Sequence, residues 1–517
     1  MKYLPTAAFM LFFAPGLCAQ NQIPVISNVI LDTDIPNSSA TLHYNLSDGE
    51  NDPLEVSIQF STNGGKTYTT LSGANVSGDV GFPVAAGNRT AVCTGLSFVA
   101  PGKYAFRVIA DDKQPFDIQA LVNEVDSNRI KNDLLFVEGI RHRTTGLAHL
   151  NATRDSLQNL YKALGLYFEK QTFSFSGSTG QNLIGSLPGT ATAEKVVVAD
   201  AHYDTVNNAP GADDNGSGTV GVMEIARLLS RYPSKKTQRY IGFDLEESGL
   251  VGSLNYVASG IPAGEQIEGV FNFEMIGYWS EEPNSQTLPA GFSLLFPVQA
   301  LQVSDNQYRG DFITNVGNAN SQSLIQLFAN SAQQYVPALK VISLAVPGNG
   351  QQVPDLRRSD HAPFWDSNRK ALMLTDGANF RNECYHTPGD SSAEKLNFTF
   401  MSNVVKATLA AMAQLVEVQH ADWAATSFEL TVGTDEPDPC SFKLLQDSGL
   451  ALLVEGCAAG EVSLEFYDMK GALLLQKNLE LSNAAPIQLS TALLPAGIYA
   501  MKIRHNGGIY TQKVVIR

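Results

Sequence analysis

The pattern of hydrophobic and polar positions divides the chain into three blocks. From about residue 24 to 115, short runs alternate between hydrophobic and polar positions, as at Tyr104, Phe106 and Val108. This alternation predicts β-strands that place one face on a core. Asn63-Gly64-Gly65 lies between two such runs and predicts a hairpin turn. We therefore expect a β-sandwich over residues 24–115.

The second block, from about residue 130 to 420, alternates strand and helix patterns. Val222, Ile225, Ala226 and Leu229 recur at helical spacing. Continuous hydrophobic runs predict strands that are buried on both faces. The expected strands are Val196–Ala199, Tyr240–Leu245, Gly269–Phe273 and Lys370–Leu374, and a long helix is expected near Phe400–Val416. This order predicts an α/β domain with a mostly parallel central sheet and helices on both faces.

The third block, from about residue 440 to 517, returns to alternation. Val462, Leu464 and Phe466 share one face of a predicted strand, and Asn506-Gly507 predicts a tight hairpin. A short linker that contains Pro437 and Pro439 precedes the block. A second β-sandwich is expected here.

Composition narrows the compartment and the partners. The chain of 517 residues carries a formal net charge of -16 and has a pI of about 5.0, so nucleic acid and anionic membranes are disfavoured partners. Residues 1–19 resemble a signal peptide with a positive start at Lys2 and a short apolar core. No later run is long and apolar enough to predict a transmembrane segment. Export would expose Cys93, Cys384, Cys440 and Cys457 to oxidising conditions, and we favour pairing of Cys440 with Cys457 while other pairings stay open.

Metal-ligand residue types follow the predicted strands of the second block. Ligands of open α/β sheets bind at the carboxyl ends of the strands, so these side chains are expected to meet at one rim. They are His202, Asp204, Asp213, Asp214, Glu246, Glu247, Glu274 and His386. Imidazole nitrogen and carboxylate oxygen suit zinc, and two zinc ions can share one carboxylate and activate one water. A neighbouring carboxylate that binds no metal would then move the proton, and Glu246 and Glu247 can divide these two roles.

Four motifs give the second block a specific resemblance. They are His202-Tyr203-Asp204, the glycine-rich Gly211–Gly218 with its two aspartates, Glu246-Glu247-Ser248-Gly249 and Tyr385-His386-Thr387. Together they resemble the co-catalytic dizinc aminopeptidases of metallopeptidase family 28. The resemblance covers roughly residues 135–420 and implies a zinc exopeptidase fold.

The resemblance implies a role for each site residue. Asp213 would bridge two Zn²⁺ ions, Glu247 and His386 would complete one ion, and His202 and Glu274 the other. Glu246 would be the general base, Asp204 would orient His202, and Tyr385 would donate a hydrogen bond to the developing oxyanion. The family often has a cis peptide bond between the acids that match Asp213 and Asp214. Glu274 departs from the family, where aspartate is more common at this position. Ser359-Asp360-His361 resembles a family element near the site and is expected to support it.

The expected function is an exopeptidase that hydrolyses N-terminal residues from peptides or proteins. A glutaminyl cyclase with one zinc ion is the first alternative, because those transferases use nearly the same ligands. Carboxypeptidase action and a catalytically inactive binding protein are the others. Retention of His202, Asp213, Glu247 and His386 argues against the inactive protein.

The flanking blocks carry weaker resemblances. The first is similar to fibronectin type III or immunoglobulin-like sandwiches, and its role as a binding module or a spacer stays open. The third resembles the C-terminal sorting domains of type IX secretion, through Phe466–Gly471, Leu494–Tyr499 and the terminal Gln512–Arg517. This resemblance implies contact with a secretion machinery, export through the periplasm, and release or attachment at the cell surface.

Overall fold

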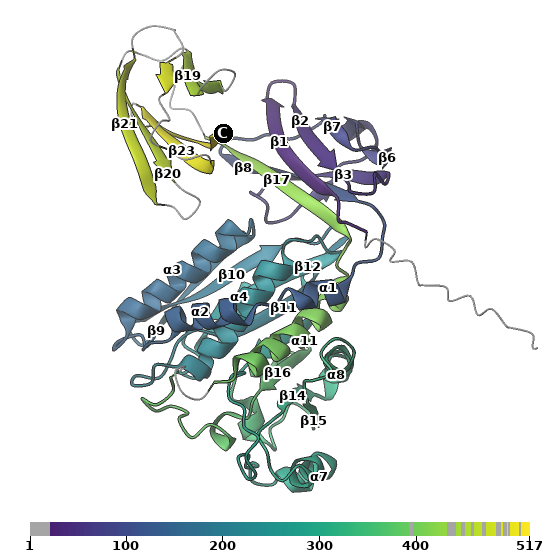
Figure 1. Cartoon of the computed structure of the whole chain (residues 1–517), viewed down its shortest axis with the longest axis vertical. Helices are drawn as coiled ribbons and strands as arrows, with labels where there is room; N and C mark the ends of the chain where they lie inside the picture. Colours follow the sequence, from purple (N-terminus) through teal and green to yellow (C-terminus); the bar gives the residue numbers. More distant parts are fainter. Residues whose placement is uncertain are drawn as a thin grey trace, which may run out of the picture. The chain divides into compact units, whose positions relative to one another are not determined.

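The computed structural model describes residues 21–391 and 396–431, together with seven strands and residues 472 and 494 in the remainder of the chain. The chain forms two compact units, Met1–Leu430 and Thr431–Arg517 (Figure 1). The expected signal peptide lies outside the described residues, as do Cys440 and Cys457. Cys93 and Cys384 are not joined in a disulfide.

Two small sheets at the start of the chain share one hydrophobic core, which includes Leu42, Val56 and Phe106. The predicted hairpin at residues 63–65 connects paired strands, with Phe60 opposite Thr69. The first sheet has the order β1 (Val25–Asp34), β2 (Ser39–Ser47), β7 (Gly87–Cys93) and β5 (Val76–Gly78). The second contains β8 (Gly102–Asp111), β3 (Leu54–Ser61), β4 (Thr69–Thr70) and β6 (Gly81–Val84).

The second sheet is completed by a strand from far along the chain. Strand β17 (Ala421–Leu430) follows the α/β domain and pairs antiparallel with β8, from Ala421 opposite Asp111 to Leu430 opposite Gly102. The fully buried Arg107 of β8 donates hydrogen bonds to Gln59 Oε1 and to the carbonyl oxygen of Pro188 in the α/β domain, both at 2.8 Å. The first β-block and the α/β domain are therefore held together by a shared strand and a buried side chain.

The α/β domain is built on an eight-stranded mixed sheet. Its order is β15 (Val341–Val346), β14 (Ile313–Asn318), β16 (Ala371–Thr375), β13 (Gln266–Phe273), β11 (Thr192–His202), β12 (Lys236–Phe243), β10 (Ser178–Leu187) and β9 (Tyr167–Phe175). The central strands β16, β13, β11 and β12 run parallel, as predicted. Strands β9 and β10 add an antiparallel hairpin, which turns at Ser176 and Gly177 in left-handed conformations, and β14 runs antiparallel to β16. The expected α/β class is confirmed, and the sheet is more mixed than expected.

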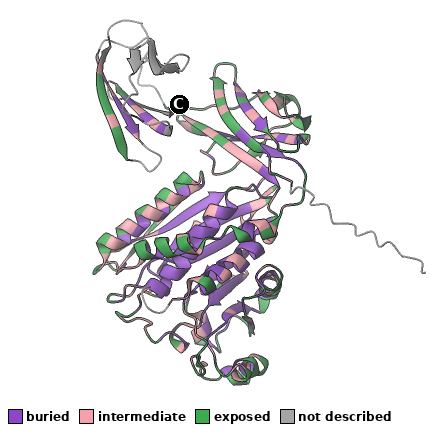
Figure 2. Cartoon of the chain, in the orientation of Figure 1, coloured by how far each residue is buried: buried purple, intermediate pink, exposed green. Residues whose placement is uncertain are grey.

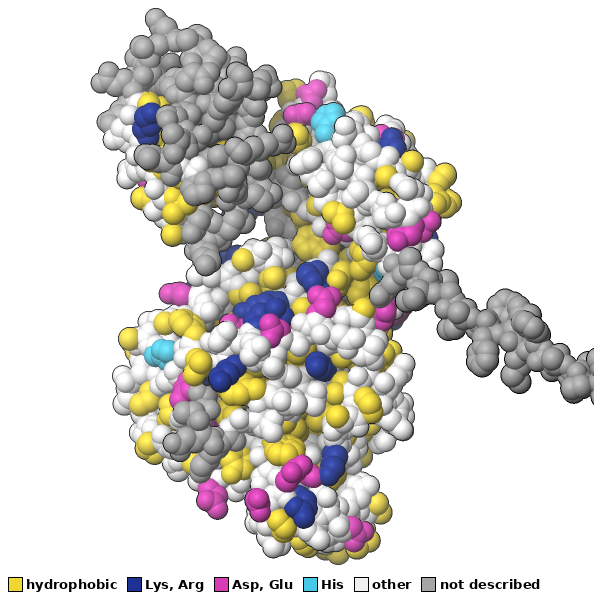
Figure 3. All heavy atoms as spheres, viewed as in Figure 1, with side chains coloured by type: hydrophobic (Ala, Val, Ile, Leu, Met, Phe, Trp, Pro, Cys, Tyr) yellow, Lys and Arg dark blue, Asp and Glu magenta, His cyan; other side chains and the backbone are white. Residues whose placement is uncertain are grey.

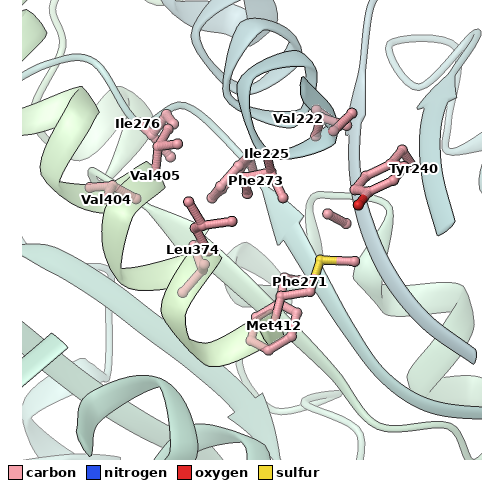
Figure 4. Packing of buried hydrophobic residues seen from close by; sticks show 14 of the residues in the cluster. Val222, Ile225, Tyr240, Phe271, Phe273, Ile276, Leu374, Val404, Val405 and Met412 are labelled. Carbon is pink, nitrogen blue, oxygen red and sulfur yellow. The ribbon is translucent and has the colours of Figure 1, made fainter. Parts of the chain in front are cut away.

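Helices cover both faces of this sheet and make two cores (Figures 1 and 2). One face carries α1 (Ile118–Asn123), α2 (Ser127–Val137), α3 (Leu147–Ala163), α4 (Gly218–Leu229), α8 (Gln322–Tyr335) and α11 (Phe398–Val416). The other carries α5 (Val251–Asn255), α6 (Phe292–Leu295), α7 (Pro297–Asp305) and α9 (His361–Asp366). Strand β11 has Val197 and Ala199 in the first core and Val196 and Val198 in the second. Figure 4 shows the first core, where Ile225 of α4 and Val405 of α11 lie near Phe273 of β13.

The second compact unit is entirely β in its described part. Strands β18 (Ser441–Leu445), β19 (Leu450–Glu455) and β22 (Ile487–Leu489) form one sheet. Strands β21 (Leu473–Leu481), β20 (Gly460–Tyr467), β23 (Gly497–His505) and β24 (Gly508–Ile516) form the other. The alternation of Val462, Leu464 and Phe466 places all three in buried positions, as predicted.

Acidic and basic side chains are interspersed on the face of the α/β domain seen in Figure 3, with no large patch of one sign. Among the helices that the structure describes, none combines the length and apolarity that a bilayer span requires.

Candidate metal centre

The site lies where the parallel strands end. His202 is the last residue of β11, Glu274 directly follows β13, and Glu246 and Glu247 follow β12 after a short turn. Parallel neighbours present their carboxyl ends at one edge of the sheet, so three segments meet there. His386 arrives from the loop beyond β16.

The first group of ligand types surrounds His202, which is fully buried. Its Nε2 lies 3.4 Å from Asp214 Oδ1 and 3.4 Å from Glu274 Oε2. Glu246 Oε2 lies slightly farther away, at 3.8 Å. His202, Glu246 and Glu274 each offer one atom to a cluster whose members lie within 4.8 Å of one another.

The second group surrounds His386. Its Nε2 lies 3.0 Å from Asp214 Oδ2 and 3.2 Å from Glu247 Oε2. Asp214, Glu247 and His386 form a second cluster of the same size. Asp214 thus directs one oxygen toward each histidine, which is the arrangement of a carboxylate shared by two cations.

The prediction that Asp213 is the shared carboxylate is wrong in this structure. Asp213 Oδ1 accepts a hydrogen bond from the Gly277 amide at 3.0 Å, and its Oδ2 accepts one from Asn382 Nδ2 at 2.9 Å. The backbone explains the difference, because the chain leaves the helical region at Asp214 (φ -98°, ψ 96°) and the two side chains diverge. The cis peptide bond is also one position later than expected, between Asp214 and Asn215.

The donors in these clusters fit bound cations. The Nε2 atoms of His202 and His386 are buried without a hydrogen-bond partner in the described part of the chain, as are Asp214 Oδ2 and Glu247 Oε1. His386 Nε2 nevertheless lies 3.0 Å from Asp214 Oδ2 and 3.2 Å from Glu247 Oε2, and His202 Nε2 lies 3.4 Å from Asp214 Oδ1. Buried polar atoms that converge without hydrogen-bond geometry are expected where a metal ion supplies the missing partner. Imidazole nitrogen and carboxylate oxygen are the ligands that zinc prefers.

The protein alone places strongly interacting charges at this site. Burial opposes protonation of His386, but its contacts with Asp214 and Glu247 outweigh burial and raise the pKa of His386 to about 10. Burial raises the pKa of Glu247 to about 7 and holds the pKa of Glu246 well above its ordinary value. Despite burial, bonds with His202 and His386 lower the pKa of Asp214. The imidazoles thus hold protons that a metal ion would have to displace.

Asp204 anchors the turn that carries the two glutamates. Its Oδ1 accepts a hydrogen bond from the Glu246 amide at 3.0 Å, and its Oδ2 lies 3.3 Å from the Glu247 amide, which donates to it. Asp204 Oδ1 also lies 3.5 Å from His202 Nδ1, so a role in orienting that imidazole stays a prediction. The contacts to both glutamate amides were not expected from the sequence.

Tyr385 lies at the rim of the site. Its ring stacks on the imidazole of His386, with centroids 3.8 Å apart. Its hydroxyl accepts a hydrogen bond from Arg358 Nη2 at 2.9 Å. Burial raises the pKa of Tyr385, so the phenol keeps its proton and is able to donate it.

Several residues outside the ligand set support the site. The buried Ser359 hydroxyl donates to Glu274 Oε2 at 2.7 Å, which gives the expected supporting role of residues 359–361 a definite contact. His361 belongs to neither ligand cluster. Its Nδ1 lies 3.3 Å from Asn272 Oδ1, and its Nε2 lies 3.0 Å from the Leu356 carbonyl oxygen. The side chains of Asp390 and Arg141 also contact the loops that bear the ligands.

A largely apolar pocket opens beside the two clusters. Glu274, Arg358 and Tyr385 belong to its lining and mark the side that faces the site. The remainder is mostly hydrophobic and comes from β14, β15, β16, α6 and α7, with Phe292, Val303, Phe312, Ile342, Leu344, Leu356 and Met373 among its residues.

Comparison with known proteins agrees with this geometry. The model of peptidase family M28 matches residues 182–412. An uncharacterized Escherichia coli protein, YfbL, is 30% identical over 273 residues, which cover 50% of this chain and 78% of that protein. The chain belongs to peptidase family M28. The recognition of this family from the four motifs is confirmed.

Other M28 relatives match shorter segments. Leupeptin-inactivating enzyme 1 of Streptomyces exfoliatus is 39% identical over 140 residues, which cover 26% of this chain and 32% of that enzyme. Aminopeptidase YwaD of Bacillus subtilis is 42% identical over 106 residues, which cover 20% of this chain and 23% of that enzyme. A solved zinc aminopeptidase from Bacillus subtilis has 26% identity and a TM-score of 0.35, with 47% of this chain and 52% of that chain covered.

These comparisons confirm the prediction of an enzyme of the metallo-aminopeptidase class, a hydrolase. The family and the two clusters of imidazole and carboxylate donors indicate zinc as its metal. The model of a secretion system C-terminal sorting domain matches residues 451–517, which confirms the resemblance noted for the third block. This match indicates export, with the protein at the cell surface or released.

Proposed function

We propose that this protein is an exported aminopeptidase that uses two zinc ions and takes peptides with a large apolar N-terminal residue. The observation that carries the proposal is the position of Asp214 between two imidazoles, with Oδ1 3.4 Å from His202 Nε2 and Oδ2 3.0 Å from His386 Nε2. A single carboxylate in this position serves two cations, whereas a structural ion pair needs only one histidine.

The ligand set follows from the two clusters. Asp214 would be shared, Glu247 and His386 would complete one zinc site, and His202 and Glu274 the other. When bound, such a pair of cations polarises the scissile carbonyl and lowers the pKa of a water molecule. Ser359 holds the carboxylate of Glu274, which lets the longer side chain replace the more common aspartate.

The remaining acid is free for proton transfer. Glu246 lies farther from His202 Nε2 than Asp214 and Glu274 do, and its side chain is nearly buried. Burial raises its pKa well above the ordinary value, and a raised pKa suits a carboxyl group that both takes and returns a proton. Glu246 would accept the proton of the attacking water and deliver it to the leaving amine. Tyr385 would donate its phenolic hydrogen to the carbonyl oxygen as negative charge develops there.

The surroundings favour the amino end of a peptide. Glu246, Glu274 and the buried Asp360 place three carboxyl groups near the site, which would accept hydrogen bonds from the free ammonium group. The apolar pocket begins beside Glu274 and Tyr385, where the first side chain of such a peptide would extend. A leucine, methionine or phenylalanine side chain would gain from leaving water there, by roughly 1.5–3 kcal/mol.

Zinc analysis combined with a substrate panel tests the proposal. Purified protein is expected to contain two zinc ions per chain and to hydrolyse leucyl and phenylalanyl reporters at least about tenfold faster than glycyl or lysyl reporters, since about 1.4 kcal/mol corresponds to a tenfold ratio. Peptides with a blocked amino end are expected to resist cleavage. Cyclisation of a glutaminyl peptide by a protein with one zinc ion would instead establish the transferase.

Substitution of the proposed base provides the second test. Glu246→Gln is expected to lower kcat by at least about 100-fold, because loss of general base catalysis typically costs this much or more. Zinc content is expected to stay near that of the wild type, because Glu246 is not in the proposed ligand set. Activity within a few fold of the wild type would contradict this role.

Export would depend on the sorting domain. Residues 451–517 would engage a secretion machinery, in line with the match of that segment. The peptide substrates would then be met outside the cell or at its surface.

A further inference from the structure

The turn that carries the shared carboxylate is held from both sides by buried charges. We propose that Arg141 and Asp390 are positioning residues that together grip residues 210–214 and thereby fix Asp214 between the two zinc sites. This inference rests on the proposed metal centre and assigns no direct contact with the substrate. Neither residue was singled out by the sequence.

Asp390 accepts hydrogen bonds from backbone amides of the turn. Its Oδ1 accepts a hydrogen bond from the Asp213 amide at 2.9 Å, and its Oδ2 accepts one from the Asp214 amide at 3.0 Å. The Ala212 amide donates to the backbone carbonyl of Asp390 at 3.2 Å. Asp390 is 1% exposed and lies four residues after His386, so it joins the loop of one ligand to the backbone of another.

Arg141 donates hydrogen bonds to backbone carbonyl groups of the same turn. Its Nη1 donates to the Pro210 carbonyl at 2.9 Å, and its Nη2 donates to the Gly211 carbonyl at 2.8 Å. Its Nε donates to the carbonyl of Tyr203, between His202 and Asp204, at 2.7 Å. The Arg141 side chain is fully buried.

The two charges compensate each other through the turn. A buried ion that lacks partners costs several kcal/mol, so both groups need opposite charge nearby. Carbonyl dipoles of residues 210 and 211 face the cation, and amide dipoles of residues 213 and 214 face the anion. The peptide groups between them are therefore held in one orientation, which sets the direction of the Asp214 side chain.

The turn leaves no room for an alternative packing. Gly211 has a φ of +61°, and a Cβ at this position would lie 2.4 Å from the Asp214 carbonyl oxygen and 2.9 Å from Arg141 Nη2. Arg141 and Asp390, which we call the clamp, thus contact the turn of the shared ligand directly through its backbone atoms.

Conservative substitutions test the clamp. In Asp390→Asn the amide NH₂ would face a backbone N–H. In Arg141→Lys the planar guanidinium, which donates to five backbone carbonyl groups, would be replaced by an ammonium group with three donors while the charge is kept. Each variant is expected to bind zinc about 10- to 100-fold more weakly than the wild type in a competition titration with a chelator. The kcat for a leucyl reporter is expected to fall at least about tenfold with KM within about threefold, because substrate contacts are intact.

Matched controls separate positioning from general destabilisation. Arg227 and Asp133 form an ion pair at 2.5 Å between α4 and α2, away from the ligand loops. Arg227→Lys and Asp133→Asn are expected to keep the zinc affinity and kcat of the wild type. The melting temperature of each metal-free variant serves as the folding control. The double variant Arg141→Lys/Asp390→Asn is expected to lose less affinity than the product of the single losses, because both residues act on one turn.

Zinc affinity within about threefold of the wild type, in either folded variant, would overturn the clamp. If Asp390→Asn does not fold, Arg141→Lys alone decides between these outcomes. A wild type that binds two zinc ions but cleaves no peptide would refute the aminopeptidase and leave the clamp to be judged by zinc affinity. A wild type that binds no zinc would overturn both.

Discussion

Single residues decide which of two adjacent acids serves the metals. The sequence places Asp213 and Asp214 together in a glycine-rich turn, and it correctly brings His202, Glu247, Glu274 and His386 to the same rim. It does not set the direction of each side chain, because that depends on contacts with Asp390, Asn382 and Gly277 from distant segments. The positions of strand ends therefore predict which residues lie near the site. They do not predict which way the side chains of Asp213 and Asp214 point.

Substitution of the two aspartates separates their roles. Asp214→Asn is expected to lower zinc content from about two ions toward none, because the shared ligand of both sites is lost. Asp213→Asn is expected to keep at least most of the zinc, since its carboxyl group bonds to Gly277, Asn382 and Asp376 and lies outside both ligand clusters. Elemental analysis after dialysis measures both. Equal zinc loss in the two variants would contradict the assignment of Asp214.

The pKa of His386 predicts how the metal-free protein responds to pH. Its folded value of about 10 lies above the ordinary value of 6.5. The raised value means that its contribution to stability is complete below about pH 6.5 and is lost as the pH rises through about 10. In the presence of EDTA, the melting temperature is expected to fall between pH 7.5 and pH 10, and to fall less in His386→Gln. A slope that is unchanged in His386→Gln would argue against the raised pKa.

At the scale of elements, a buried network of an ion pair and hydrogen bonds orients the turn after β12. Arg154 of α3 pairs with Asp244 at 2.5 Å, and Asp244 also accepts hydrogen bonds from the amides of Gln181 and Leu245. Leu245 then adopts a φ of +57° and leads into Glu246. The sequence predicted the strand and the acids after it, but it gave no sign that a helix would supply the cation that orients them.

Removal of this cation is expected to be costly. Arg154→Met would leave Asp244, which is fully buried, without its partner, and the free energy of unfolding is expected to fall by about 3–5 kcal/mol. Urea unfolding measures the change. Lys162→Met, on the same helix and more exposed, is the control and is expected to change stability by less than about 0.5 kcal/mol. A similar effect of both substitutions would contradict the role of the network.

At the scale of the whole molecule, the sequence predicted the blocks better than their connections. Alternation and strand–helix order located the β-blocks and the α/β domain. Strand β17 falls between the second and third predicted blocks, and the local pattern cannot identify β8, its partner from the beginning of the chain. The antiparallel strands β9, β10 and β14 were not predicted for the same reason, because strand pairing depends on residues far apart in the sequence.

Two truncations test this connection. A protein that ends at residue 431 keeps β17 and is expected to retain aminopeptidase activity and a melting temperature close to that of the full chain. A protein that ends at residue 420 exposes the edge of β8 and part of the first hydrophobic core, so we expect a melting temperature at least about 5 °C lower and a tendency to aggregate. Differential scanning calorimetry and light scattering compare them. Equal behaviour would mean that β17 is dispensable.

The pairing of Asp111 with Ala421 places the entry and the exit of the α/β domain side by side on neighbouring antiparallel strands. In topological terms, the catalytic domain is an insertion into the loop of a β-hairpin. Two residues of a tight turn suffice to join such strands. The host sheet is therefore compatible with a circularly rearranged or domain-deleted chain in which β8 leads straight into β17.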